Sequence, residues 1–259
     1  MADRTLSPEE RALRRTWSSL WDSKKGEAGA WDSLSESVFL TLRSEIGELR
    51  GRRILEAGCG TGRISARIAE EGGRVTCLDI APEALALAKR QFKEGDGTRF
   101  VLSSILEVPR ENEYDVIWNS GVMEHLVAGD QQRAIGEFLS ILRPGGKVVL
   151  LTPYSRSLLY RMGKWMLEKT HRWPFGREVP VRSLGPVTPA SGALVREYSV
   201  SFLPLVFDSH KWIPAARPFL KAMYAALVKL LGPRVLFKID LLCSRAFGGY
   251  LLVSVIARR

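Results

Sequence analysis

The chain has 259 residues, of which 46% are hydrophobic and 25% charged, and its formal net charge is +10. This size and apolar content predict one folded domain with a large core and exclude a disordered or low-complexity chain. Three irregularly spaced cysteines exclude a disulfide framework and a zinc motif. The first residues lack the apolar core of a signal peptide, and no uncharged apolar run is long enough to span a bilayer. We therefore expect a cytoplasmic protein, either soluble or peripheral to a membrane.

The first fifty residues carry four large aromatic side chains on segments that look helical. These are Trp17, Trp21, Trp31 and Phe39. Two roles are open for such helices ahead of the first strand. They can pack against the sheet, or they can form a lid over a bound ligand.

The most informative segment is 54–63, where an apolar strand ends at Glu56 and a turn with three alternate glycines follows. Glycines let the backbone turn tightly and let a ligand lie against bare peptide groups. A dinucleotide fingerprint needs Gly or Ala three residues after the second glycine, where this chain has Arg63. Glu56 would also repel a pyrophosphate. The segment therefore favours a cationic ligand over NAD or FAD.

S-adenosylmethionine meets this requirement, because it carries a sulfonium and an ammonium group and no phosphate. Residues 56–62, Glu-Ala-Gly-Cys-Gly-Thr-Gly, resemble motif I of the class I S-adenosylmethionine-dependent methyltransferases. A second buried strand pattern ends at Asp79, about twenty residues past the first glycine, where a carboxylate meets a ribose diol in such folds. The resemblance implies S-adenosylmethionine as cofactor. The cofactor contacts it implies in this region are Glu56, Gly58, Cys59, Gly60, Gly62, Asp79 and Ile80.

Further landmarks of this family follow in order across residues 51–152. Residues 98–109 resemble the third strand and its adenine-contacting loop, where the family usually has an Asp. This chain has Ser104 and then Ile105, and a hydroxyl accepts a hydrogen bond more weakly than a carboxylate does. The fourth strand pattern ends near Asn119, which the resemblance places beside the methionine portion of the cofactor.

The expected fold class is α/β, a doubly wound, Rossmann-like sheet of seven strands with an antiparallel last strand. Helical patterns at 63–71 and 82–92 separate the early strands, which implies parallel pairing with right-handed crossovers. The last two strands are expected at 193–202 and 249–256. The expected organisation is an N-terminal helical lid at 1–50 and a methyltransferase domain at 51–259, with basic helical insertions at about 155–190 and 208–245.

The segment after the fourth strand is similar to the Glu-His segment of the small-molecule and quinone O-methyltransferases of this superfamily. His125 is the predicted general base, or a hydrogen-bonding group that orients the acceptor. Its alternative is a structural histidine that caps the next helix or bonds the backbone. Glu124 is a second catalytic candidate, with a structural role as its alternative. In that branch an acid three residues before the Glu helps hold a metal, and this chain has Gly121 there, so no metal site is predicted.

The basic excess lies entirely in the last part of the chain, where residues 151–259 hold 17 Lys or Arg and 5 Asp or Glu. Large apolar residues recur between these cations at helical spacing, around Trp165 and Tyr224. Basic amphipathic helices with interfacial Trp are typical of binding to an anionic membrane surface. The alternative is that these helices pack on the domain and their cations are solvated. RNA binding is a third possibility, although no recognised RNA-binding module accompanies it.

The sequence as a whole predicts a methyltransferase that acts on a small, apolar or lipid-like acceptor. An RNA or protein methyltransferase would use the same core and differ only in its acceptor. A non-catalytic nucleoside-binding module is a further alternative, as is a dinucleotide-binding oxidoreductase, which Arg63 and Glu56 oppose.

Overall fold

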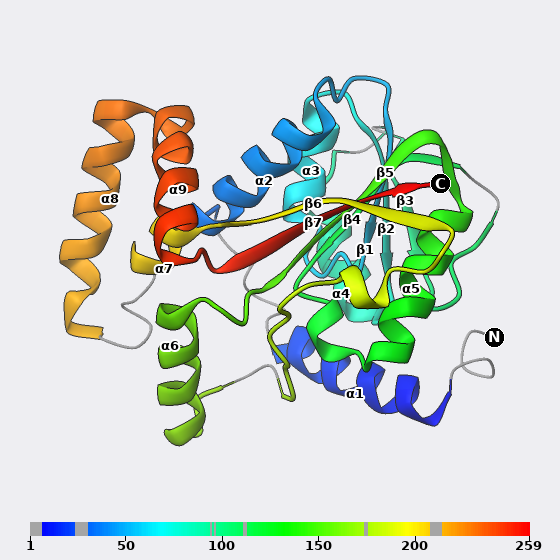
Figure 1. Cartoon of the computed structure of the whole chain (residues 1–259), viewed down its shortest axis with the longest axis horizontal. Coiled ribbons are helices and arrows are strands. Elements are labelled where there is room, and N and C mark those ends of the chain that lie inside the picture. Colours follow the sequence, from blue (N-terminus) through cyan, green and yellow to red (C-terminus); the bar gives the residue numbers. More distant parts are fainter. Residues whose placement is uncertain are drawn as a thin grey trace.

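A seven-stranded sheet forms the centre of the protein (Figure 1). The computed structural model describes residues 7–23, 31–93, 95, 97–110, 113–173, 176–207 and 214–259. The strands are β1 (Arg53–Ala57), β2 (Arg74–Asp79), β3 (Arg99–Leu102), β4 (Tyr114–Ser120), β5 (Leu142–Pro153), β6 (Gly192–Val200) and β7 (Leu251–Arg258). They lie in the order β3-β2-β1-β4-β5-β7-β6. β1 to β5 pair in parallel, and β7 is antiparallel to both of its neighbours. The predicted fold class is confirmed.

Helices cover both faces of the sheet, which explains why its central strands are apolar without interruption. Successive strand residues point to opposite faces. On β1, Ile54 packs in a cluster with Leu42 and Ile68, whereas its neighbour Leu55 packs in a cluster with Phe138. The helices are α1 (Pro8–Ser23), α2 (Ser33–Ile46), α3 (Arg63–Glu70), α4 (Pro82–Lys89), α5 (Ala128–Ser140), α6 (Leu158–Lys169), α7 (Phe202–Phe207), α8 (Arg217–Leu231) and α9 (Pro233–Phe247), with short 3₁₀ helices η1 (Met123–His125), η2 (Gly185–Val187) and η4 (Pro214–Ala216).

The strand order reverses between β1 and β4, the two neighbours at the middle of the sheet. β2 and β3 lie on one side of this point and β5 on the other. In open sheets of this kind, ligands bind at such a switch point, beyond the carboxyl ends of the strands. Glu56 on β1 is in register with Trp118 on β4, so the switch point is lined by the ends of these two strands.

The two N-terminal helices have different surroundings. α2 is part of the core, where Val38, Phe39 and Leu42 are buried. α1 instead packs on α4 and crosses the lower edge of the molecule in Figure 1. Trp31 precedes α2 rather than lying on a helix, and its ring meets that of Phe39 edge-on with centroids 6.0 Å apart, which corrects the helical prediction at that residue.

The basic helices gather at one end of the sheet. α8 has no buried residue and packs on α9, which in turn contacts β6 and α7, while α6 lies below them in Figure 1. Residues 174–175 and 208–213 of the predicted insertions, and residues 1–6 and 24–30 of the predicted lid, fall outside the described residues. Among the described residues, no helix combines the length and apolar character needed to cross a bilayer.

Candidate active site

The glycine turn after β1 is anchored to the end of β2 by its own backbone. The amides of Gly58 and Cys59 both donate to the Leu78 carbonyl, at 2.7 and 2.9 Å. Gly60 and Gly62 have φ values of +51° and +63°, a region that side chains with a Cβ rarely adopt. The turn therefore holds its shape only with glycine at these positions, and it fixes the backbone from β1 into α3.

Asp79 joins this turn to the end of β2. One carboxylate oxygen accepts from the Gly60 amide at 2.8 Å, and the other accepts from the Ala81 amide at 2.9 Å. Burial raises the pKa of Asp79, and the backbone amides oppose that shift. A carboxylate has about four acceptor positions, so two remain for a diol. The next residue, Ile80, is half-buried beside it.

Several buried polar side-chain atoms at the switch point lack hydrogen-bond partners among the described residues. Oε2 of Glu56 is one, and both amide atoms of the fully buried Asn119 are others. Burial raises the pKa of Glu56 to about 8; the Ser65 hydroxyl opposes this shift, the charge of Asp79 adds to it and Arg63 opposes it. Because buried polar groups are nearly always hydrogen-bonded, this pair indicates a place where a polar ligand or ordered water binds.

Ser104, after β3, is buried against α1. Its hydroxyl donates to the Glu10 carboxylate and accepts from the Leu106 amide at 3.1 Å. Burial raises the pKa of Glu10, but hydrogen bonds from Ser104 and Ser7 outweigh it and lower the pKa overall. An ionised carboxylate from α1 therefore lies beside Ser104, at the loop where the resembling family has an Asp. Ile105 is buried at this loop.

The same helix covers two further parts of the site. A Cβ added at Gly60 would meet the Trp21 ring at 2.9 Å, so this ring lies directly against the glycine turn. Trp17 meets the His125 ring edge-on, with centroids 5.0 Å apart. α1 thus contacts the glycine turn, the loop after β3 and the segment after β4. A ligand lying on bare backbone at Gly60 requires the Trp21 ring to move.

The surroundings of His125 select its tautomer. Nδ1 lies 2.9 Å from the Arg177 carbonyl, which can only accept, so Nδ1 carries the proton. In the neutral ring, Nε2 then keeps its lone pair. Burial lowers the pKa of His125, with the Arg177 carbonyl opposing and Lys164 adding to the shift. The ring is therefore a neutral base at physiological pH.

His125 belongs to a cluster with two carboxyl groups. Nε2 lies 3.9 Å from Oε1 of Glu124, and one ligand atom from each of Glu124, His125 and Glu178 lies within 4.8 Å of the others. Burial raises the pKa of Glu124 well above its ordinary value and that of Glu178 to about 7. Tyr160 donates to Glu178. These three side chains are the candidate ligands for a metal ion in the described part of the chain, and the absence of an acid at Gly121 leaves Glu178 as the second carboxylate.

Sequence reasoning did not identify Glu10 or Glu178 as site residues. Glu10 bonds a residue 94 positions away, and Glu178 reaches the cluster from a segment between α6 and β6. Neither residue belongs to a local motif. The glycine turn, Asp79, Asn119 and His125, by contrast, stand in motifs with recognisable neighbours.

Comparison with known proteins finds a family model that matches the part of the chain around the glycine turn. Residues 54–146 match the family model described as a methyltransferase domain. The ubiquinone biosynthesis O-methyltransferase of Xanthomonas euvesicatoria pv. vesicatoria (strain 85-10) is 32% identical over 108 residues, which are 40% of this chain and 44% of that protein. The protein of the same name from Escherichia coli O7:K1 is 27% identical over 171 residues, 64% of this chain and 68% of that protein.

Solved structures agree on the fold. The magnesium protoporphyrin IX methyltransferase from Synechocystis PCC 6803 has a TM-score of 0.55 at 18% identity, covering 73% of this chain and 91% of that chain. A TehB-like S-adenosylmethionine-dependent methyltransferase from Corynebacterium glutamicum ATCC 13032 has a TM-score of 0.52 at 18% identity, covering 96% and 100%. The chain therefore has the Rossmann-like fold of the class I methyltransferases. Within this fold, residues 54–146 match the methyltransferase domain model, in the region where the motifs predicted such a domain.

Replacement of Gly62 by alanine tests the geometry of the turn. The new Cβ would lie 2.9 Å from Cβ of Ala88 and 3.3 Å from its Cα, at a backbone φ of +63°. Gly145 has a similar φ of +77° but nothing within 4 Å, so Gly145→Ala reports the backbone strain alone. We expect Gly62→Ala to lower the free energy of unfolding by roughly 1–3 kcal/mol more than Gly145→Ala, measured by urea denaturation. Equal losses would show that the turn has room for a side chain.

Proposed function

We propose that this protein transfers a methyl group from S-adenosylmethionine to a hydroxyl group of a small-molecule acceptor. The observation that carries the proposal is that Oε2 of Glu56 and both amide atoms of Asn119 are buried without partners at the ends of β1 and β4, beside the glycine turn. A carboxyl group with a pKa of about 8 gains its charge most easily next to a cation. S-adenosylmethionine brings an ammonium and a sulfonium group to such a site.

Each part of the cofactor has a matching group in the chain. Asp79 has two acceptor positions left for the ribose hydroxyls, and Asn119 and Glu56 suit the methionine portion. The ionised Glu10, beside Ser104, would accept a hydrogen bond from the adenine amino group, because a carboxylate is a stronger acceptor than the Ser104 hydroxyl. Trp21 must leave the turn for the cofactor to lie there, and α1 then covers it as a lid.

The protein's own contribution to the reaction is small and specific. S-adenosylmethionine would supply a methyl group bonded to a positively charged sulfur. When the acceptor oxygen bonds to the methyl carbon, the carbon–sulfur bond breaks and its electron pair stays on the sulfur. Alignment and exclusion of water are then the main tasks of the enzyme. The Nε2 atom of His125 takes the proton from the acceptor hydroxyl, while Nδ1 keeps its own proton and donates it in the hydrogen bond to the Arg177 carbonyl. The aromatic ring of Trp17 shields this base from solvent.

The relatives named ubiquinone biosynthesis O-methyltransferase support a small-molecule acceptor with a hydroxyl group. Because the chain aligns with 44% to 68% of those proteins, the acceptor is inferred from the site as well as from them. RNA or protein as acceptor is the second candidate, and the basic C-terminal surface is its only support. Transfer of label from methyl-labelled cofactor in a cell extract separates these candidates.

Binding of the cofactor should depend on pH through Glu56. With a pKa of about 8 in the free protein, this carboxyl is mostly protonated at pH 7. A cation beside it lowers the pKa, so binding releases a proton and affinity rises as pH increases toward 8. We expect calorimetry in buffers of different ionisation enthalpy to detect this release. Glu56→Gln should abolish it, and an unchanged release in Glu56→Gln would contradict the assignment.

Glu10 should contribute to cofactor affinity although it lies far from the glycine turn in sequence. We expect Glu10→Ala to weaken S-adenosylhomocysteine binding about tenfold, the effect of losing one hydrogen bond to a charged group. Glu36, an acidic residue on α2, is the control, because its carboxylate instead accepts from the exposed Trp31 indole. Equal affinities for wild type, Glu10→Ala and Glu36→Ala would place the adenine elsewhere.

His125→Asn separates the base from its structural alternative. Asparagine keeps an N–H donor for the Arg177 carbonyl but has no basic nitrogen. We expect the rate of labelled product to fall about 10²- to 10⁴-fold, with cofactor affinity unchanged. A rate close to wild type would make His125 structural. Loss of wild-type activity in chelator, restored by Mg²⁺, would instead assign the cluster of Glu124, His125 and Glu178 to a metal ion.

We also propose attachment to an anionic membrane through α6. Leu158, Met162 and Trp165 recur at helical spacing and are 72%, 51% and 58% exposed. Packing on the domain, the alternative for this helix, therefore leaves these three side chains in solvent. Apolar side chains beside a basic surface are typical of helices that lie in a membrane interface.

Sedimentation with vesicles tests the attachment. We expect the protein to sediment with vesicles containing phosphatidylglycerol at low salt, and less at high salt because the attraction is screened. Trp165→Ser should reduce sedimentation, whereas Trp31→Ser, at another exposed tryptophan, should not. If the wild type stays in the supernatant at low salt, the proposal fails.

A further inference from the structure

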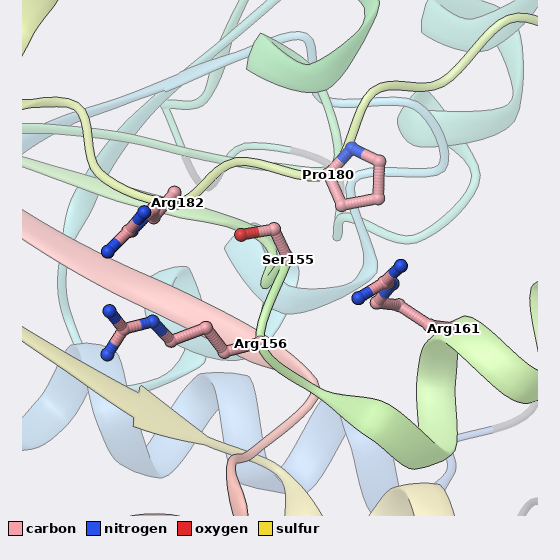
Figure 2. A pocket seen from close by; sticks show the side chains of 5 residues that line it. All are labelled: Ser155, Arg156, Arg161, Pro180 and Arg182. Carbon is pink, nitrogen blue, oxygen red and sulfur yellow. The ribbon is translucent and has the colours of Figure 1, made fainter.

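A basic cavity of about 590 Å³ lies beyond the carboxyl end of β5. None of the residues that line it belongs to the site described above. Its lining consists of Ser155, Arg156, Arg161, Pro180 and Arg182. Figure 2 shows Arg156 and Arg182 extending to the same side of Ser155, while Arg161 comes from α6 on the side of Pro180. Three exposed arginines from three places in the sequence therefore line one open cavity, from two sides of Ser155.

The backbone fixes this arrangement. Tyr154 and Val181 form an isolated parallel bridge, the Ser155 amide donates to the Val181 carbonyl at 2.9 Å, and the Val181 amide donates to the Pro153 carbonyl at 2.8 Å. These bonds hold Arg156 and Arg182 on adjacent segments. α6 starts at Leu158, two residues after Arg156, so the partial positive charge of its N-terminal end lies close to Arg156.

No carboxylate among the described residues neutralises these arginines. The three arginines are exposed, so water screens much of their mutual repulsion, and a bound anion would remove what remains. Each described acidic residue after position 150 is already engaged elsewhere: Glu168 with Lys164, Glu178 with Tyr160, Glu197 with Ser183 and Ser254, and Asp240 with the Ser201 and Leu203 amides.

We propose that this cavity binds a phosphate group of the methyl acceptor. One arginine satisfies a carboxylate through a pair of parallel hydrogen bonds, whereas three guanidinium groups and a serine hydroxyl match a doubly charged group with three terminal oxygens. The identification as part of the acceptor rests on the proposed function. The identification of a phosphate site does not.

One short segment connects the cavity to the base. The Arg177 carbonyl holds His125, Glu178 belongs to the cluster around it, and Pro180 and Arg182 line the cavity. Four residues of extended chain span at most about 14 Å, so the Cα atoms of Glu178 and Arg182 are no further apart than this. An acceptor anchored by its phosphate in the cavity can therefore present a hydroxyl to His125 if these two groups are separated by a similar length.

Two sources could supply the phosphate, a lipid headgroup or a soluble phosphorylated metabolite. Leu158 lies two residues after Arg156 and is 72% exposed. Apolar side chains at the rim would contact the acyl chains of a lipid whose headgroup fills the cavity. A soluble metabolite needs the arginines only.

Calorimetric titration with inorganic phosphate tests the site in the absence of cofactor. We expect saturable binding to wild type, weakened about tenfold in Arg182→Ala and in Arg156→Ala. Arg234→Ala, which removes the same charge from the exposed part of α9 outside the cavity, should bind like wild type. Absence of saturable binding, or equal weakening in all three variants, would overturn the proposal.

Vesicle binding at fixed ionic strength distinguishes the sources. If the ligand is a headgroup, Arg182→Ala reduces sedimentation with phosphatidylglycerol-containing vesicles more than Arg234→Ala does, and soluble glycerol phosphate competes. If the ligand is a soluble metabolite, the two variants sediment alike and phosphate binding still depends on Arg182. Both results support a phosphate site.

The failure of the two proposals can be told apart. Arg182→Ala should leave S-adenosylhomocysteine affinity unchanged and raise the KM for the acceptor that carries label. If the wild type binds phosphate but not S-adenosylhomocysteine, the proposed methyl transfer fails and the phosphate site stands. If it methylates an acceptor without phosphate and Arg182→Ala leaves that KM unchanged, the link between cavity and acceptor fails.

Discussion

The arrangement of the site depends on one constraint, a carboxyl group buried where the order of the strands reverses. Glu56 lies at the end of β1 with Asn119 close to the end of neighbouring β4, and neither is fully hydrogen-bonded within the described residues. A buried carboxylate without a partner is costly, so Glu56 stays protonated until a cation or donor arrives. The glycine turn and Asp79 hold the backbone around it, and together these groups favour a cationic nucleoside over a pyrophosphate.

Around this centre, segments outside the sheet cover the site. α1 places Glu10, Trp17 and Trp21 over three different elements of the site. On the other side of His125, the segment that contains Arg177 and Glu178 sets the tautomer of the base and continues to the arginine cavity.

The sheet and the glycine turn could be predicted from the sequence because their signals are local. Strand residues alternate between two covered faces, and the glycine positions are set by their own backbone angles. The last two strands were also predicted to within two residues at each end. The contacts of Glu10 and Glu178 could not be predicted, because each depends on how distant segments pack. The sequence also left open whether the apolar residues of α6 are buried. The structure shows that Leu158 and Trp165 are exposed to solvent.

The central claim is that the switch point accepts a positively charged nucleoside and rejects a diphosphate. Equilibrium competition between S-adenosylmethionine and NADH on the wild-type protein tests it most directly. The account predicts saturable binding of S-adenosylmethionine that excess NADH does not displace. Binding of NADH with no detectable binding of S-adenosylmethionine would contradict it.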